Sequence, residues 1–312
     1  MIWPSIGVVI PTRTRPRLLA HALNSVLAQD YPGPLRVVVV YDQVPPDRGL
    51  ARGGDRPVTV IANWRRPGLI GARDTGILAL DTDLVAFCDD DDRWLPGKLS
   101  AQVRALEDEP GAEFSTCAIE VQYRGRRSIR LAGRTRITRD QLLVSRRAML
   151  HPSGFLVRRA SLIEIGPDGI GPDGIGLFAE DAPSEDAADW DLLLRAANRT
   201  PIVHVDEPLV RVLWSHTSRF SYEYDSKIDS LEWLLDRHPE IAECAPGAAR
   251  VYGQMACWSA ARGDRRAALR FTRQAVRHNW REPRAAIALA AASRVVRVES
   301  VLEALHRHGH GI

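Results

Sequence analysis

Four consecutive aspartates, Asp89 to Asp92, directly follow the apolar run 84–88. An apolar run without polar alternation is typical of a strand buried on both faces, as in parallel sheets. Ligands of open α/β sheets bind just beyond the carboxyl ends of such strands. Neighbouring carboxylates repel one another, and their oxygens are the ligands that Mg²⁺ and Mn²⁺ prefer, especially beside a phosphate. The run therefore predicts a divalent-cation site, with an acidic loop that leads into a helix as the alternative.

The four aspartate side chains are expected to differ in direction. Along an extended chain, Asp89 and Asp91 point to one side, whereas Asp90 and Asp92 point to the other. We therefore expect one pair to face a ligand, while the other pair is capped or solvated.

The segments around the aspartates predict alternating strands and helices. Strands are predicted by the apolar runs at 6–10, 35–40, 58–61 and 84–88. Helices are predicted between them by apolar residues at helical spacing, at 18–27 and at about 69–80. This alternation favours βαβ units and a mostly parallel sheet flanked by helices.

The remainder of the chain has a different pattern. Residues 113–160 are more strand-like, and a further strand is expected at 201–205, followed by a segment at 209–214. Asp189 is expected to open an amphipathic helix, and residues from about 227 onward predict helices, with a turn at Gly263-Asp264. The repeated Gly-Pro-Asp-Gly-Ile at 166–170 and 171–175 predicts two successive turns.

The composition is that of an ordinary globular protein. The chain has 312 residues, a net charge of +3, 45% hydrophobic residues and 26% charged residues, so we expect no nucleic-acid partner. No secretory signal pattern and no apolar run of about 20 residues occurs, so we expect no transmembrane span. The four cysteines lack metal-binding spacing and fit a reducing compartment. We expect a cytoplasmic protein, with peripheral association at the membrane as an open alternative.

Two common nucleotide-binding classes are disfavoured by missing motifs. The first predicted strand is followed by Pro11-Thr12-Arg13 rather than by the GxGxxG pattern of dinucleotide-binding proteins. The GxxxxGK[ST] phosphate loop is also absent from the sequence.

Several segments, taken in order, resemble family 2 glycosyltransferases with the GT-A fold. The resemblance covers roughly residues 5–220, and the order and spacing of its motifs are specific. Gly71 to Gly76 resembles the family's G-x-A-R-N-x-G helix start, with Asp74 where Asn is usual. The other resembling segments are the opening strand and helix at 8–13 and 23–29, the second strand at 39–43, the DxD motif with its tail at 87–99, and the E-D-x-D-L-W-L-R segment at 189–195.

The resemblance implies a GT-A domain at 1–225, with a nucleotide-binding half at 1–100 and an acceptor half at 101–225. A helical C-terminal extension at 226–312 would follow, and its helices are a candidate surface for homo-oligomers. The implied activity is metal-dependent, inverting transfer of a sugar from a nucleotide-sugar donor. The acceptor would carry a hydroxyl group, on a glycan, a lipid or a small molecule.

The resemblance also implies roles for individual residues. Asp91 and Asp89 would hold Mn²⁺ or Mg²⁺, with His216 as a further candidate ligand. Asp42 would accept a hydrogen bond from the N–H of a pyrimidine ring, which favours a UDP- or dTDP-sugar. The nucleotide-sugar-binding candidates are Pro11, Thr12, Arg13, Asp42, Arg73, Asp89 and Asp90.

An inverting transfer needs a carboxylate that removes the proton of the acceptor hydroxyl. Alignment with the family motif places Asp189 in this role, although Ala188 occupies the position where Glu is usual. Because Glu185-Asp186 lies three residues earlier, Asp186 is the alternative base. A purely structural role for Asp189, at the N-terminus of a helix, also remains open.

Two other functions remain as alternatives. A sugar-phosphate nucleotidyltransferase also uses a carboxylate-bound metal beside a nucleotide, but its Gly-rich triphosphate loop is missing after the first strand. A catalytically degenerate GT-A module that binds a nucleotide or a glycan is favoured only by Ala188 and the repeated loop.

Overall fold

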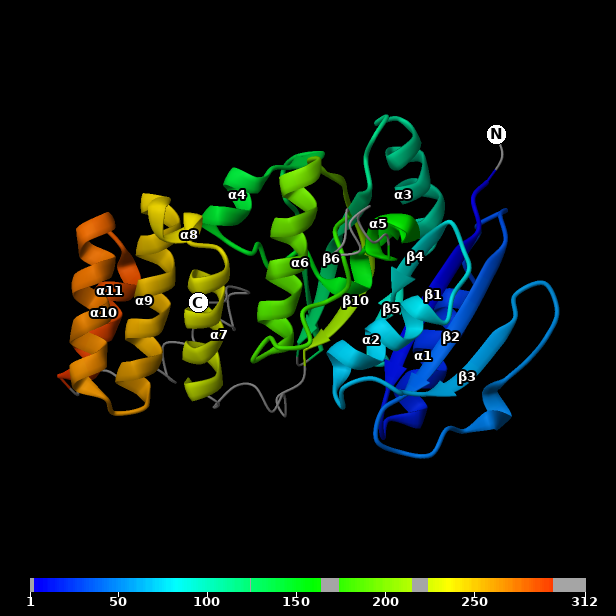
Figure 1. Ribbon diagram of the computed structural model, residues 1–312, viewed down its shortest axis with the longest axis horizontal. Coiled ribbons are helices and arrows are strands. Elements are labelled where there is room, and N and C mark those ends of the chain that lie inside the picture. Colours follow the sequence, from blue (N-terminus) through cyan, green and yellow to red (C-terminus); the bar gives the residue numbers. More distant parts are fainter. Residues whose placement is uncertain (1–2, 124, 164–173, 215–223, 294–312) are drawn as a thin grey trace, which may run out of the picture. The chain divides into compact units, whose positions relative to one another are not determined.

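The computed structural model describes residues 3–123, 125–163, 174–214 and 224–293 (Figure 1). The chain divides into two compact units. The first consists of residues 1–139, 147–180 and 191–215, and the second of residues 140–146, 181–190 and 216–312. The domain boundary expected at residue 225 remains a prediction. The repeated Gly-Pro-Asp-Gly-Ile segment lies almost entirely outside the described residues, and His216 lies outside them as well.

The described part of the first unit is built on a ten-stranded mixed sheet with the order β3-β2-β1-β4-β9-β6-β10-β5, to which β7 and β8 add at β6 and β10. Its strands are β1 (Ile6–Thr12), β2 (Leu35–Tyr41), β3 (Val58–Ala62), β4 (Leu84–Phe87), β5 (Arg93–Trp94), β6 (Phe114–Tyr123), β7 (Arg126–Arg130), β8 (Arg136–Ile137), β9 (Leu156–Arg158) and β10 (Ile202–Trp214). The first four strands are parallel, and β9 pairs antiparallel with both β4 and β6. The chain therefore has the expected α/β architecture, with a sheet whose first four strands are parallel.

Helices flank this sheet (Figure 1). They are α1 (Pro16–Leu27), α2 (Leu69–Leu78), α3 (Lys98–Glu107), α5 (Arg159–Ile163) and the 3₁₀ turns η1 (Arg48–Leu50) and η2 (Pro152–Gly154). Val8 and Ile10 of β1 share one buried cluster with residues of α1 and α3. A Cβ on Gly76 of α2 would overlap the side chain of Val9, so α2 packs closely against β1 only because residue 76 is glycine.

The register of the parallel strands brings three chain segments to one edge. Thr12 at the end of β1 pairs with Tyr41 at the end of β2, and Val9 pairs with Phe87 at the end of β4. The residues that follow β2 and β4 are Asp42 and the aspartate run, respectively. Because the carboxyl ends of parallel strands meet at the same edge, the sequence places its polar residues where such sheets bind ligands.

The described part of the second unit is helical. It contains α4 (Arg139–Val144), α7 (Tyr224–Arg237), α8 (Glu240–Glu243), α9 (Ala245–Ala261), α10 (Arg265–His278) and α11 (Pro283–Ala292). Helix α9 packs against α7, α10 and α11. The predicted turn at Gly263-Asp264 separates α9 from α10, where Asp264 accepts a hydrogen bond from the backbone N–H of Ala267 (2.9 Å). Across the described residues, no helix is both long and apolar enough to cross a bilayer.

Two elements differ from the sequence-based expectation. The segments 201–205 and 209–214 form one strand, β10, whose register shifts on both sides of Pro208, since proline cannot donate a ladder hydrogen bond. Helix α6 (Glu185–Arg199) begins four residues before Asp189. The hydroxyl of Ser184 accepts from the backbone N–H of Ala187 (3.2 Å), so Ser184 supplies the cap that was expected near Asp189.

Candidate active site

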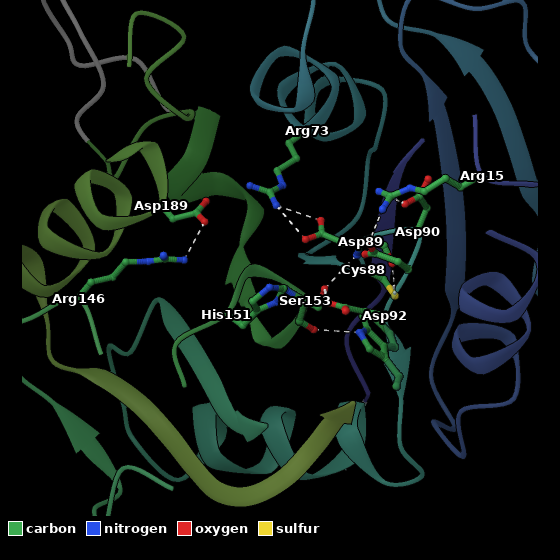
Figure 2. Close-up of polar contacts among 12 residues, drawn as sticks. Arg15, Arg73, Cys88, Asp89, Asp90, Asp92, Arg146, His151, Ser153 and Asp189 are labelled. Atoms are coloured by element: carbon green, nitrogen blue, oxygen red, sulfur yellow. Dashed lines mark hydrogen bonds and ion pairs between the residues drawn. The ribbon is translucent and has the colours of Figure 1, made fainter. Parts of the chain in front are cut away.

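The aspartate run forms a tight turn directly after β4, at the carboxyl edge of the sheet (Figure 2). The backbone N–H of Asp92 donates to the carbonyl of Asp89 (3.0 Å). Asp90 and Asp92 are buried, at 1% exposed each, whereas Asp89 and Asp91 are partly exposed. The alternation expected from the sequence is therefore present in the burial of the four residues, although each carboxylate has a protein partner.

Arg15 joins two of the aspartates. Its two terminal nitrogens form ion pairs with Asp90 and Asp91, one with each. The hydroxyl of Thr12 donates to the second oxygen of Asp90 (2.6 Å). Thr12, a predicted nucleotide-binding residue, therefore fixes the aspartate turn to the end of β1.

Ser153 holds the other end of the turn, and sequence reasoning did not single it out for this role. Its hydroxyl accepts from the backbone N–H of Asp89 (3.0 Å) and donates to Asp92 Oδ2 (2.6 Å). Its carbonyl accepts from the indole N–H of Trp94 (2.9 Å), and His151 Nδ1 lies 3.4 Å from Asp92 Oδ2. Ser153 lies within the stretch 113–160 that was expected to be strand-like, and its sequence neighbours did not indicate a contact with the aspartates.

Arg73 neutralises Asp89 from the opposite side, on helix α2. Its Nη2 lies 2.9 Å from Asp89 Oδ1, and its side chain is 2% exposed. The guanidinium carbon also lies 5.4 Å from the ring centroid of Phe178, which packs edge-on against Phe87 of β4. Arg73 therefore contacts the aspartate turn, and its expected binding of the nucleotide sugar remains a prediction.

The electrostatics of the turn reflect burial and mutual repulsion. Burial and the charges of neighbouring carboxylates raise the pKa of Asp90 to about 6 and the pKa of Asp92 well above its ordinary value. Burial acts to raise the pKa of Asp89, but the charges of Arg73, His151 and Arg15 and the hydrogen bond from Arg73 together outweigh it, so the pKa of Asp89 is lowered. Burial raises the pKa of Asp91. The turn therefore concentrates negative charge in a region of limited solvation.

The turn fits a hard divalent cation. One ligand atom each from Asp89, Asp92 and His151 lie within 4.8 Å of one another. Asp92 is the least available of these, because its oxygens accept from Ser153 and from the backbone N–H of Leu213 (3.2 Å). The four carboxylates have two arginine partners, Arg15 and Arg73, so an excess of negative charge remains for a cation to neutralise.

Asp42 lies at the same edge, just after β2. Its oxygens accept from Asn63 Nδ2 (2.9 Å), from the backbone N–H of Gly68 (3.0 Å) and from Gln43 Nε2 (2.8 Å). Burial acts against ionisation, but these hydrogen bonds lower the pKa of Asp42. Asn63 also accepts from the hydroxyl of Thr75 on α2 (2.7 Å). Asn63 was missed by the sequence reasoning, although a polar residue directly after strand β3 was a signal available for it.

The remaining predicted donor-site residues lie nearby on the chain. Pro11 is buried within β1, and Arg13 is exposed just beyond it. Arg13 Nη2 lies 3.5 Å from the side-chain oxygen of Gln43, the neighbour of Asp42.

The two candidate bases belong to the second unit and share one arginine. Arg146 Nη2 lies 3.3 Å from Asp189 Oδ2, and its Nη1 pairs with Asp186. The side chain of Asp189 is 4% exposed, whereas that of Asp186 is 75% exposed. Both lie on α6, so neither residue is the N-cap of the helix.

Comparison with known proteins identifies the class to which this fold and this edge site belong. Residues 7–166 match the family model described as Glycosyl transferase family 2. The match covers just over half of the chain, so the chain belongs to glycosyl transferase family 2, and it has the GT-A fold.

Three similar proteins illustrate the relationship. The chain is 29% identical, over 122 residues, to a GalNAc(5)-diNAcBac-PP-undecaprenol beta-1,3-glucosyltransferase of Campylobacter jejuni, covering 38% of this chain and 39% of that protein. The structure of S. aureus TarS 1-349 in complex with UDP-GlcNAc superposes with a TM-score of 0.60 at 15% identity, covering 98% of this chain and 92% of that one. The mannosyltransferase PcManGT from Pyrobaculum calidifontis, in complex with GDP-Man and Mn²⁺, gives a TM-score of 0.52 at 17% identity, with 97% and 80% covered.

Proposed function

We propose that this glycosyltransferase moves a sugar from a UDP- or dTDP-sugar to an acceptor hydroxyl, with inversion and with the help of Mn²⁺ or Mg²⁺. The observation that carries the proposal is the aspartate turn after β4, held between Arg15, Arg73 and Ser153 at the carboxyl edge of the sheet. The complexes of TarS with UDP-GlcNAc and of PcManGT with GDP-Man and Mn²⁺ support a nucleotide-sugar donor and a metal.

The turn would stabilise the leaving group. When the sugar is transferred, the nucleoside diphosphate leaves and its negative charge grows. A bound divalent cation would neutralise this charge as a Lewis acid. Asp91 and Asp89, the two partly exposed carboxylates, would hold that cation. Asp90 and Asp92 are buried and bonded to Thr12 and Ser153, and these bonds would shape the turn, while Asp90 would also contact the nucleotide sugar.

Asp42 would recognise the base. Uracil and thymine present a ring N–H that can donate to a carboxylate, whereas cytosine presents an acceptor at the same ring position. Asp42 Oδ2 accepts from Gln43, and a carboxylate oxygen can accept a second donor. The lowered pKa of Asp42 keeps this group ionised near neutral pH, so both of its oxygens can accept hydrogen bonds.

Asp189 would act as the general base. It would take the proton of the acceptor hydroxyl as the oxygen attacks the anomeric carbon from the face opposite the leaving diphosphate. The pairing with Arg146 fixes the orientation of its carboxylate. We propose glycans, lipids and small molecules as acceptor classes and a cytoplasmic location, with peripheral association at the membrane as an alternative.

Calorimetry with UDP, dTDP, GDP and CDP, each with and without Mn²⁺, tests the donor assignment. We expect UDP and dTDP to bind more tightly than CDP and GDP, and only when Mn²⁺ is present. Binding that does not depend on the metal would overturn the role of Asp91 and Asp89, and equal affinity for UDP and CDP would overturn the role of Asp42.

A further inference from the structure

Helix α10 of the second unit presents a strongly basic exposed face. Five of its 14 residues are arginine, and its sequence contains no acidic residue. At the angular spacing of an α-helix, Arg266, Arg270, Arg273 and Arg277 share one side, and all four are exposed. None of the four forms an ion pair with a carboxylate among the described residues.

The opposite face of α10 is fully used in packing. Ala268, Phe271, Thr272 and Ala275 are buried, and the helix contacts α9 and α11 (Figure 1). The arginines therefore lie directly opposite the buried face and do not take part in the core of the helical bundle. They are therefore accessible to a partner outside this part of the chain.

Apolar side chains run beside the arginines. Leu269 and Val276, two turns apart on α10, are 43% and 41% exposed, and Trp280, just after the helix, is 72% exposed. Arg281 covers one face of the Trp280 ring, with its guanidinium carbon 4.6 Å from the ring centroid. Exposed tryptophan and aliphatic side chains beside a row of cations are typical of helices that lie in a membrane interface.

The acidic groups around α10 are unevenly distributed. Asp229 and Glu232 of α7 line the same cleft as Arg266 and Arg270, so they weaken the positive potential at the N-terminal end of the helix. Arg273 and Arg277 lie farther along the helix and do not line this cleft. The positive charge of these two arginines is therefore the least compensated on this face. The exposed Trp280 follows them in the chain.

We propose that the exposed face of α10, together with Trp280, docks on an anionic lipid surface. The arginines would contact the headgroups, while Leu269, Val276 and Trp280 would enter the boundary with the acyl chains. A second copy of the chain fits this face poorly, because two rows of arginine would repel each other. A nucleic acid would satisfy the arginines, but it offers no hydrocarbon phase for Leu269 and Val276.

Vesicle cosedimentation of the full chain tests the proposal. We expect binding to vesicles of phosphatidylcholine with about one-third phosphatidylglycerol, and none to phosphatidylcholine alone. Each basic residue at such a surface contributes about fivefold in partitioning, so Arg273→Gln/Arg277→Gln should weaken binding about 25-fold. Trp280→Ser should weaken it severalfold, and high salt should abolish the contribution of the arginines.

Matched variants elsewhere on the chain provide the controls. Arg48→Gln/Arg52→Gln removes the same charge from two exposed arginines around η1, and Trp64→Ser removes another exposed tryptophan, at 58% exposure. Neither control should change vesicle binding. Three outcomes would overturn the proposal: no binding to anionic vesicles, equal loss in the controls, or a self-associated state that Arg273→Gln/Arg277→Gln dissociates. Binding of a single-stranded oligonucleotide more tightly than anionic vesicles, with no effect of Trp280→Ser, would reassign the face to nucleic acid.

Discussion

Arg73 and Asp89 form a buried ion pair, in which Nη2 lies 2.9 Å from Oδ1 and 3.3 Å from Oδ2 of the carboxylate. The pair links helix α2 to the residues just after β4, the next element along the chain. Because the ring of Phe178 covers the guanidinium group, water can compete with this contact only weakly. The charge of Arg73 is therefore a permanent part of the environment of Asp89 rather than a surface charge.

Arg73→Gln should be strongly destabilising and should impair donor binding. Removing one partner of a buried ion pair costs about 3–5 kcal/mol, and the loss here should lie toward the lower end because the side chain of Asp89 is 16% exposed. The pKa of Asp89 should rise without Arg73, so the acidic limb of the pH–activity profile should move to higher pH. Urea unfolding and a pH profile measure the two effects. Arg73→Lys should recover part of both, and an unchanged profile in Arg73→Gln would contradict this role.

Ser153→Ala should loosen the aspartate turn. The substitution leaves the backbone N–H of Asp89 and one oxygen of Asp92 without their buried partner, at a cost of about 1–3 kcal/mol. We expect a lower urea midpoint and a weaker metal-dependent affinity for the nucleotide. Ser259→Ala is the matched control, since Ser259 is also buried and its hydroxyl has no partner among the described residues. Equal stability losses in the two variants would argue against a special role of Ser153.

Asp74 should make the stability of the protein depend on pH. Burial raises its pKa to about 7, and its Oδ1 accepts from the backbone N–H of Phe178 (3.1 Å). Between the ordinary aspartate pKa of about 4 and about 7, the folded chain binds one more proton than the unfolded chain. The free energy of unfolding should therefore fall by about 1.4 kcal/mol per pH unit over this window as the pH rises, and then level off.

Asp74→Asn isolates this effect. Asparagine keeps the oxygen that accepts from Phe178 but has no charge to bury, and it is the residue found in the motif that 71–76 resembles. The variant should be more stable than the parent chain at about pH 8 and similar to it at about pH 4, by urea unfolding at both values. A parent chain and variant with the same pH dependence would show that Asp74 does not hold its proton at neutral pH.

The sequence predicted the framework of this site well because its signals are local. Each of the strands β1, β2 and β4 contains an apolar run, and polar residues follow it closely in the chain. Parallel pairing then brings their carboxyl ends together without further information. The expected opposite directions of alternate aspartates needed only the period of an extended chain.

The partners of the aspartates could not be predicted in the same way. Ser153 reaches the turn from 61 residues beyond Asp92, and Phe178 reaches Asp74 across 104 residues. Such contacts depend on tertiary packing, and the sequence around Ser153 or Phe178 does not indicate them. The start of α6 was misplaced for a related reason, because Asp189 resembled a cap while Ser184 provides one.

Substitution of Asp91 should impair donor binding, whereas substitution of Asp189 should impair only the transfer step. Asp91→Asn removes a charge from the proposed cation site, so metal-dependent nucleotide affinity should fall by at least tenfold in calorimetry. Asp189→Asn keeps the shape of the side chain but removes the proposed base, so it should bind the nucleotide normally while turnover falls by about 10²–10⁴-fold. Asp186→Asn is the matched control, since Asp186 pairs with the same Arg146 but is exposed. If Asp186→Asn lost turnover and Asp189→Asn kept it, the base would be Asp186, and the pairing of Asp189 with Arg146 would be structural.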